Sequence, residues 1–314
     1  MKTLGKPESN SDVLNKHPTT LLIGVGWVGQ YIGKYFTESH YVTEDGIFRK
    51  LSDNSEVEPL ENYELAFIGV PTPMLPSGQC DTSIVEAVVK QYAPIVSHFC
   101  CKSTVEIGTC DKLFLRDDIS ICMSPEYIGE TLGHPLLEPS RETFIILGGP
   151  KKTTRVFAEA WTLVTNARTK IYQVNARTAE LCKLMENSFI ATKVMFCNEF
   201  FDLAEQIGAD YNELREIFLA DPRMSRDFTY VYRNNRGFSG KCLPKDLNNL
   251  AFFYRNFVGK RAELIEFLLK RNAELRKDYN NSVPLLGDEL KEKNEKTKHI
   301  NTSKKRRVSK SNSK

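Results

Sequence analysis

The sequence predicts an α/β domain, built on a parallel sheet with helices on both faces, that is followed by an all-helical domain. Three observations support this fold class. Short apolar runs alternate with helical stretches in the first half of the chain. A glycine-rich turn, residues 24–29, follows the first of these runs. From about residue 177 onward, the apolar residues recur at helical spacing instead.

Five runs in the first half have the apolar character of buried strands. Helical periodicity lies between some of them, from the glycine-rich turn to about Phe36 and from Thr82 to about Val96. Because strands that alternate with helices form parallel sheets, we expect one sheet with helices on both faces. The five expected strands are residues 19–25, 65–70, 99–102, 119–123 and 143–147.

The second half is predicted to be helical throughout. One long helix is expected from Arg177 to about Ile207, because its apolar residues repeat at i, i+3 and i+4. Shorter helical segments follow at about 211–219, 245–256 and 260–277. We therefore expect four parts: a flexible arm at 1–17, the α/β domain at 18–176, the helical domain at 177–278 and a basic, disordered tail at 279–314.

The composition is that of an ordinary globular protein. The chain has 314 residues, 41% of them hydrophobic and 26% charged, which allows about two domains with normal cores. The net charge of +3 is uneven, because residues 291–314 contain ten Lys and Arg but only two Glu. The rest is mildly acidic, which argues against nucleic-acid binding by the folded body. We expect a solvated tail; the alternatives are a nuclear-import-like cluster at Lys304–Arg307 and a site for acidic partners.

Nothing in the sequence predicts a membrane protein or a secreted one. No apolar stretch approaches the roughly 20 residues of a membrane helix, and residues 1–16 are polar. The eight cysteines include no pair at zinc-ligand spacing, so we expect no metal site. Free thiols are typical of a reducing compartment, which predicts a cytoplasmic location.

Gly24, Gly26 and Gly29 have the GxGxxG spacing of a dinucleotide-binding turn between a strand and a helix. The first glycine allows the tight turn, the second lets the backbone approach a diphosphate at the helix N-terminus, and the third lets the helix pack on the strand. The alternative is a glycine-rich turn without a ligand. Glu44 and Asp45 stand about 20 residues further on, where an acidic residue binds the ribose hydroxyls, so we expect NAD rather than NADP.

A second glycine-rich segment, residues 237–246, contains Cys242 just before a predicted helix. A cysteine at a helix N-terminus has a lowered pKa, and Lys241 and Lys245 would lower it further. This combination predicts a nucleophilic thiol. Asp246 lies four residues beyond Cys242 and can face the same site. The alternative is a structural thiol.

Two pairs of polar residues, each one helical turn apart, are further candidates. Lys183 and Asn187 share a face of the long helix, where a solvated surface is the alternative interpretation. Glu126 and Glu130 follow the predicted strand that ends near Met123, and the alternative for them is an exposed helix start. Spacing alone leaves both alternatives open.

Taken together, these residues resemble the UDP-glucose/GDP-mannose dehydrogenases, NAD-dependent enzymes that oxidise a sugar alcohol twice to the uronate. The resemblance covers roughly residues 19–277. It implies a Rossmann-like NAD-binding domain followed by a helical central domain that dimerises. Six blocks match in order, at residues 24–29, 70–81, 102–109, 124–127, 179–199 and 237–246.

The resemblance implies several roles in catalysis. Cys242 matches the nucleophile, which captures an aldehyde as a thiohemiacetal and then carries a thioester. Lys183 matches a lysine that assists proton removal and stabilises an oxyanion, with Asn187 beside it. Asp246 and Thr104 match a pair that positions water.

The resemblance also implies binding residues. Glu126 matches the glutamate used in thioester hydrolysis, and Glu130 lines the sugar-nucleotide site. Arg223 matches an arginine that reaches the substrate of the neighbouring subunit, which implies a homodimer built on the long helix. NAD contacts are expected at Trp27, Val28, Asp45, Pro71, Thr72, Thr104 and Glu130, and contacts to the nucleotide sugar at Glu126, Tyr127, Lys183, Asn187, Phe228, Gly237 and Phe238.

The chain departs from the family pattern at several places. Ser239 replaces a glycine, which would crowd the loop or force its φ angle, and Leu243 stands where phenylalanine is common. The segment between Gly29 and Val70 is short. The roughly 36 residues after Asp278 are too few for the third, UDP-binding domain of the family.

We therefore expect UDP-glucose as the substrate and UDP-glucuronate as the product. Two alternatives stay open at this point. The substrate could be GDP-mannose or a UDP-N-acetylhexosamine, because base recognition rests largely on parts that this chain lacks. Without a third domain, the chain could also be a non-catalytic remnant that still binds NAD.

Overall fold

The computed structural model describes residues 17–128 and 143–277. Three earlier expectations fall outside these residues: the arm before residue 17, the site residue Glu130, and the basic tail from 279 onward. Among the described helices, none has both the length and the hydropathy needed to cross a membrane.

The described chain forms two compact units, each of which is discontinuous in the sequence. We call the first the sheet unit; its described residues are 17–72, 81–126 and 143–181. We call the second the helical unit; its described residues are 73–80, 127–128 and 182–277.

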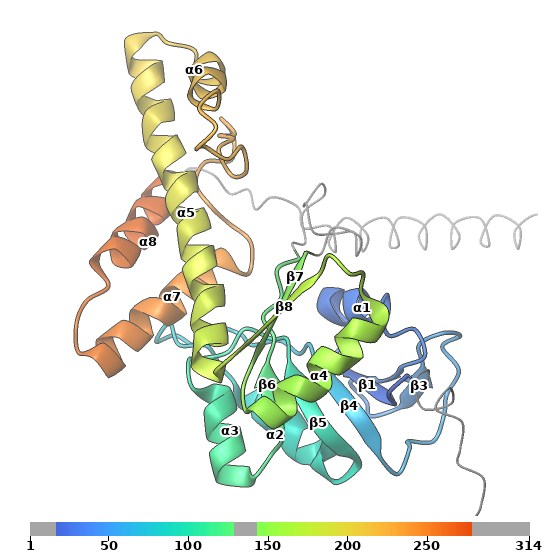
Figure 1. The fold of residues 1–314 in the computed structure, drawn as a ribbon. Coiled ribbons are helices and arrows are strands. Elements are labelled where there is room, and N and C mark those ends of the chain that lie inside the picture. Colours follow the sequence, from blue (N-terminus) through green and yellow to red (C-terminus); the bar gives the residue numbers. More distant parts are fainter. Residues whose placement is uncertain (1–16, 129–142, 278–314) are drawn as a thin grey trace, which may run out of the picture. The chain divides into compact units, whose positions relative to one another are not determined.

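An eight-stranded sheet forms the centre of the sheet unit (Figure 1). The strand order is β3-β2-β1-β4-β5-β6-β7-β8. Neighbouring strands pair in parallel, except that β2 with β3 and β6 with β7 are antiparallel. The strands are β1 Thr20–Ile23, β2 His40–Val42, β3 Phe48–Lys50, β4 Tyr63–Ile68, β5 Val96–Cys101, β6 Ile121–Met123, β7 Phe144–Gly148 and β8 Lys170–Val174.

The predicted α/β fold class is confirmed, but the sheet is mixed rather than purely parallel. β2 and β3 were missed because each has three residues and neither is fully buried, so neither forms an apolar run. The turn at residues 43–47 between them is too short for a crossover, which makes the pair antiparallel. β8 was missed because its side chains are mostly exposed.

Four α-helices belong entirely to the sheet unit. The helix predicted near Thr82 is present, and the one after the glycine-rich turn ends three residues before Phe36. The sequence pattern missed the last two of the four. The helices are α1 Trp27–Gly33, α2 Ser83–Tyr92, α3 Thr109–Asp117 and α4 Lys151–Val164, and a 3-10 helix at Ala93–Ile95 precedes β5.

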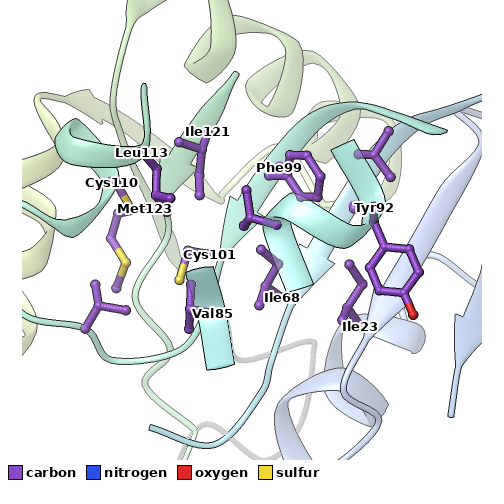
Figure 2. Packing of buried hydrophobic residues seen from close by; sticks show 14 of the residues in the cluster. Ile23, Ile68, Val85, Tyr92, Phe99, Cys101, Cys110, Leu113, Ile121 and Met123 are labelled. Atoms are coloured by element: carbon purple, nitrogen blue, oxygen red, sulfur yellow. The ribbon is translucent and has the colours of Figure 1, made fainter. Parts of the chain in front are cut away.

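One face of the sheet carries an apolar cluster shown in Figure 2. Ile68 of β4 is fully buried in this cluster, together with Val85 of α2 and Leu113 of α3. Tyr92, at the end of α2, closes one side of it. The apolar positions of these two helices therefore pack on the same face, as an amphipathic helix requires.

The opposite face carries an aromatic cluster. Phe67 precedes Ile68 in β4 and points to the other face, because side chains alternate along a strand. Its ring centroid lies 5.4 Å from that of Phe157 and 5.9 Å from that of Trp161, both in α4. Phe36, after α1, adds a ring at 5.0 Å. The expectation that helices cover both faces of the sheet is thus confirmed.

The helical unit confirms the prediction of an all-helical second half. Its longest helix, α5, has 32 residues and begins within the sheet unit. α7 begins two residues earlier than predicted, because Pro244 is accommodated in its first turn, where no backbone N–H donor is needed. The helices are α5 Ala176–Ile207, α6 Tyr211–Phe218, α7 Leu243–Phe253 and α8 Glu263–Arg276, with a π-helix at Tyr254–Val258 after α7.

Candidate active site

The glycine-rich turn between β1 and α1 has the packing that a dinucleotide site needs. Gly24 has a φ angle of +89°, and a Cβ atom there would lie 2.7 Å from the carbonyl oxygen of Gly69. A Cβ atom on Gly29 would lie 2.2 Å from the carbonyl oxygen of Gly24. A Cβ atom on Gly26 would meet nothing within 4 Å. The first and third glycines are therefore required by the fold, whereas the second leaves open space beside the backbone, which fits the approach of a diphosphate.

The candidate ribose-binding residue follows β2. Because β1 and β2 are parallel neighbours, their carboxyl ends lie at one edge of the sheet, and Asp45 comes shortly after that end. Asp45 accepts a hydrogen bond from the Thr43 hydroxyl, which lowers the pKa of the exposed Asp45 carboxyl. An ionised, accessible carboxylate is the group that a ribose diol needs.

The loops after β4 and β5 are tied together beside the same sheet edge. The Thr72 hydroxyl donates to the carbonyl oxygen of Thr104 at 2.7 Å. The Ser103 hydroxyl donates to the carbonyl oxygen of Val70 at 2.7 Å. These bonds join Pro71 and Thr72, which are candidate NAD contacts, to Thr104, a candidate for water positioning.

Glu126 is buried, so the exposed-helix-start alternative does not hold for it. It follows β6, and its carboxylate forms an ion pair with Lys102 at 3.1 Å, with only 3% and 8% of the Lys and Glu side chains exposed. The Lys102 ammonium also donates to the Ser124 hydroxyl at 3.2 Å. Sequence reasoning missed Lys102; the signal was a lysine placed directly after a buried strand.

Glu180, on the first turns of α5, is a second residue that sequence reasoning missed. Its carboxylate accepts from the backbone N–H groups of Gly108 at 2.5 Å and Cys110 at 3.0 Å, at the start of α3. Burial raises the pKa of Glu180 to about 7, against the two backbone N–H groups that lower it. Glu180, Gly108 and Cys110 all belong to the sheet unit, where Glu180 caps the N-terminus of α3.

The helical unit places the predicted nucleophile at the start of α7. Cys242 is exposed and is the N-cap residue of α7. Its carbonyl oxygen accepts from the Asp246 N–H at 2.9 Å, which makes the first helical turn. The thiol is thus accessible at a helix N-terminus, where the partial positive charge of the helix favours a thiolate.

Asp246 is buried one turn further along α7, where three side chains converge. The Asn187 amide donates to its carboxylate at 2.6 Å, and the Lys245 ammonium is paired with its other oxygen at 2.8 Å. Burial lowers the pKa of Lys245, but the Asp246 charge and hydrogen bond, together with the charges of Cys80 and Cys242, outweigh burial, and the net pKa is raised. The Lys245 ammonium also lies 3.9 Å from the Cys80 sulfur.

Lys183 lies one turn before Asn187 on α5. The Lys183 ammonium stands 4.8 Å from the ring centroid of Tyr127, and the Tyr127 hydroxyl lies 3.7 Å from the Cys182 sulfur. Asn187 is only 5% exposed, so the solvated-surface alternative does not hold for it. Burial raises the pKa of the adjacent Glu186, while Lys183 lowers it.

The loop that leads to Cys242 is fixed through its backbone. The Asn272 side chain accepts from the Phe238 N–H at 2.8 Å and donates to the Phe238 carbonyl oxygen at 3.0 Å. Gly237 has a φ angle of +73° and leaves room for Asn272. Positive φ outside glycine occurs, among the described residues, only at Asn54, Asp118 and Phe228. Ser239 therefore does not impose the φ strain expected from the sequence.

Arg223 and Phe228 lie in the connection between α6 and α7. Arg223 is paired with Asp221 at 2.5 Å and lines a pocket of about 560 Å³ together with Phe189 and Phe196 of α5. Phe228 is 41% exposed. All eight cysteines lie in the described part of the chain and none forms a disulfide, and no cluster of metal-ligating side chains occurs there.

Two family models match the chain. The model described as "UDP-glucose/GDP-mannose dehydrogenase family, NAD binding domain" matches residues 37–173, and the model of the central domain of the same family matches residues 177–274. The first match begins after the glycine-rich turn. The packing of that turn therefore adds an independent feature to the match.

Curated proteins with similar sequences carry names that agree with the two family models. A UDP-glucose 6-dehydrogenase of Rickettsia bellii is 29% identical over 249 residues, which are 76% of this chain and 56% of that protein. A UDP-glucose 6-dehydrogenase of Bacillus subtilis is 29% identical over 242 residues, 73% of this chain and 52% of that protein. This chain spans about half the length of the curated relatives that it matches.

A solved structure with the same fold is that of a UDP-glucose dehydrogenase from Pyrobaculum islandicum. It has a TM-score of 0.67 and 22% identity, and the match covers 86% of this chain and 70% of that one. A UDP-D-ManNAc dehydrogenase from Pyrococcus horikoshii has a TM-score of 0.64 and 20% identity, over 82% and 69% of the two chains. At these identities the likeness establishes the fold alone.

Proposed function

Because this chain belongs to the UDP-glucose/GDP-mannose dehydrogenase family, we propose that it oxidises a nucleotide sugar with NAD as the acceptor. We propose UDP-glucose as the sugar, since the relatives from Rickettsia bellii and Bacillus subtilis are named UDP-glucose 6-dehydrogenase. Oxidation of its primary alcohol to the acid gives UDP-glucuronate. Activity of this chain by itself is part of the proposal.

The arrangement at the start of α7 carries the proposal. An exposed thiol, Cys242, stands at the helix N-terminus, and one turn away the buried Asp246 is held by Asn187 and Lys245. A nucleophilic cysteine needs a positive local potential and oriented polar neighbours. A structural thiol needs neither, and it would be buried.

The sheet unit supplies the residues that would hold NAD. Gly24, Gly26 and Gly29 would hold the diphosphate, and Asp45 would accept from the ribose hydroxyls. When bound, NAD accepts one hydride from the alcohol carbon and, in a second round, one from the thiohemiacetal carbon.

The helical unit supplies the residues for the two oxidations. Lys183 and Asn187 assist removal of the proton from the sugar hydroxyl and stabilise the oxyanion that forms. The Cys242 thiolate adds to the aldehyde carbon and forms a carbon–sulfur bond, which gives a thiohemiacetal. After the second oxidation, Cys242 carries the sugar as a thioester.

Hydrolysis ends the reaction. Asp246 and Thr104 would orient a water molecule, and Glu126 would take its proton as the water oxygen adds to the thioester carbon. The carbon–sulfur bond then breaks, and Cys242 leaves as the thiolate. Covalent catalysis in this form divides a four-electron oxidation into steps that one nicotinamide site can perform.

We also propose a homodimer formed along α5, located in the cytoplasm. Large apolar side chains of α5 are exposed, among them Met185 at 72% and Phe189 at 65%. Contiguous exposed apolar surface is typical of a protein interface. Arg223, in the pocket beside Phe189, would then lie near the partner subunit and could reach its substrate.

One experiment tests the function. The purified chain is mixed with NAD and, in turn, UDP-glucose, GDP-mannose and a UDP-N-acetylhexosamine, and NADH is followed by absorbance. We expect two NADH for each UDP-glucose consumed. Cys242→Ser is expected to lose thioester formation and net turnover.

The alternatives give different results in the same assay. Turnover with GDP-mannose or the UDP-N-acetylhexosamine alone would assign another substrate within the family; solved structures of similar fold include the UDP-D-ManNAc dehydrogenase. NAD binding without NADH from any sugar would identify a non-catalytic remnant. Equal turnover by wild type and Cys242→Ser would contradict the covalent mechanism.

A further inference from the structure

The ion pair of Lys102 and Glu126 joins the ends of two neighbouring strands. Lys102 directly follows β5, and Glu126 comes three residues after β6. The strands are parallel neighbours, with Cys101 opposite Met123. Both side chains therefore start from the same edge of the sheet, where ligands bind in folds of this class.

The Lys102 side chain contacts three groups, two of them in the segment that follows β6. Its ammonium forms the 3.1 Å ion pair with Glu126, donates to the Ser124 hydroxyl at 3.2 Å and stands 5.9 Å from the ring centroid of Trp161. Its own N–H donates to the Ile68 carbonyl oxygen at 2.9 Å, so the backbone at Lys102 is tied to β4. The lysine thus connects the segment after β6 to the rest of the sheet.

Lys102 and Glu126 are both buried, so their ion pair is not a solvent-screened surface contact. Whole-residue exposure is 4% for Lys102 and 9% for Glu126. A charged carboxylate in such a place is costly unless a counter-charge compensates it. A general base must carry its charge before it can take a proton, so a buried base depends on its compensating cation.

We propose that Lys102 is a positioning residue that holds the Glu126 carboxylate, charged and oriented, for hydrolysis of the Cys242 thioester. This inference rests on the proposed function. Glu126 takes a proton from water, the water oxygen bonds to the thioester carbon, and the Cys242 sulfur leaves with the electron pair of the broken bond. Lys102 takes no part in either hydride transfer.

This role predicts that loss of Lys102 affects one half of the reaction. In Lys102→Met, formation of the thioester is kept while its hydrolysis slows by about 10- to 100-fold, less than the roughly 10²- to 10⁴-fold that general-base catalysis contributes, because Glu126 itself is retained. The variant is mixed with NAD and UDP-glucose and quenched over time. NADH gives the burst and steady-state rates, and intact-protein mass gives the fraction of Cys242 that carries the sugar.

The expected result is a burst of two NADH per chain, a slow steady state and accumulated adduct on Cys242. Lys102→Arg, which keeps the charge, is expected to restore part of the steady-state rate. Lys112→Met is the matched control, because Lys112 forms an ion pair of the same 3.1 Å length with Glu86 at the surface. Equal slowing of burst and steady state in Lys102→Met, without adduct, would overturn the inference.

A second measurement needs no turnover. Urea midpoints at pH 8 are compared for wild type, Lys102→Met, Glu126→Gln and the double variant. If Lys102 compensates Glu126, Lys102→Met lowers the midpoint and adding Glu126→Gln restores part of it. Additive shifts would overturn the inference.

The two measurements separate the two proposals. No NADH from wild type with any sugar would refute the proposed function, and the urea midpoints would still decide whether Lys102 compensates Glu126. Normal turnover by wild type, with no adduct in Lys102→Met, would refute the role of Lys102 alone.

Discussion

The sheet unit and the helical unit each hold a buried carboxylate beside a lysine, but by different means. Glu126 and Lys102 are brought together by the register of β5 and β6, that is, by backbone pairing. Asp246 and Asn187 meet because side chains of α7 and α5 pack together, and their 2.6 Å hydrogen bond is itself part of that packing. Backbone pairing survives the loss of one side chain, whereas packing between helices depends on the side chains directly.

The largest loss in the free energy of unfolding that this comparison predicts follows the replacement of Asp246. Asp246→Leu leaves Lys245, whose side chain is only 16% exposed, without its counter-charge, and breaking an ion pair that is largely buried in this way costs about 3–5 kcal/mol. Glu126→Leu should cost less, because Lys102 keeps the Ser124 hydroxyl and the Trp161 ring as partners. Urea unfolding measures both free energies.

The control for Asp246 is the double variant Lys245→Met with Asp246→Leu. It removes both charges from the buried site and is expected to recover part of the lost free energy of unfolding. A smaller loss for Asp246→Leu than for Glu126→Leu would contradict the contrast between the two units.

The next largest effect on the free energy of unfolding is expected from Glu180, and this effect depends on pH. Burial raises the pKa of Glu180 to about 7 in the folded chain, above the ordinary value of 4.5. The folded state thus binds the proton more tightly, so its stabilising contribution is complete below about pH 4.5 and is lost as the pH rises through 7. A shift of this size corresponds to about 3 kcal/mol.

The measurement is the free energy of unfolding of wild type and Glu180→Gln between pH 4.5 and 8. The glutamine oxygen can still accept from Gly108 and Cys110, but the side chain does not titrate. The difference between the two proteins should therefore change across this range, in favour of the variant at higher pH. Parallel curves would show that Glu180 does not titrate in the folded chain.

A smaller effect sharpens the comparison within the glycine-rich turn. Gly29→Ala would place a Cβ atom 2.2 Å from the Gly24 carbonyl oxygen, and such overpacking costs about 1–3 kcal/mol. Gly26→Ala meets no protein atom within 4 Å. It should fold with normal stability and bind NAD more weakly, which calorimetry with NAD would measure; unchanged NAD affinity would contradict a diphosphate beside Gly26.

The smallest effect concerns the reactivity of Cys242. The Cys242 charge helps to raise the pKa of Lys245, so the Lys245 charge must favour the Cys242 thiolate in return. Lys245→Met should therefore slow alkylation of Cys242 by iodoacetamide at pH 7, by about 3- to 10-fold. Peptide mapping by mass spectrometry gives the rate for this cysteine alone.

Lys193→Met is the control for that measurement, because Lys193 is a half-buried lysine of α5 that donates to the Ser225 hydroxyl at 2.7 Å. It should leave the alkylation rate of Cys242 unchanged. Equal rates in wild type and Lys245→Met would exclude a role for Lys245 in activating the thiol.

The sequence predicted those elements whose backbone structure is determined by residues close together in the chain. The glycine spacing, the long apolar periodicity of α5 and the proline after Cys242 located the turn and the two helices, because each depends on neighbouring residues alone. Short or exposed strands such as β2 and β8 left no such pattern.

The site was less accessible to sequence reasoning than the fold. Lys102 and Glu180 have partners that are distant in the sequence, and a buried charge cannot be distinguished from a surface charge until the partner is known. Lys245 was expected only as a neighbour of Cys242, whereas its ammonium is shared between Asp246 and the Cys80 sulfur.

The loop at residues 73–80 limits how this protein can be divided. It leaves the sheet unit after Thr72, and its Cys80 N–H donates to the Asn249 side chain of α7 at 3.0 Å before the chain returns to the sheet unit. A fragment from residue 182 onward would leave that oxygen of Asn249, a fully buried residue, without its donor. A chimera of two relatives joined near residue 176 would therefore combine the 73–80 loop of one protein with the α7 of the other. We expect such chimeras to fold only when the loop and α7 come from the same parent.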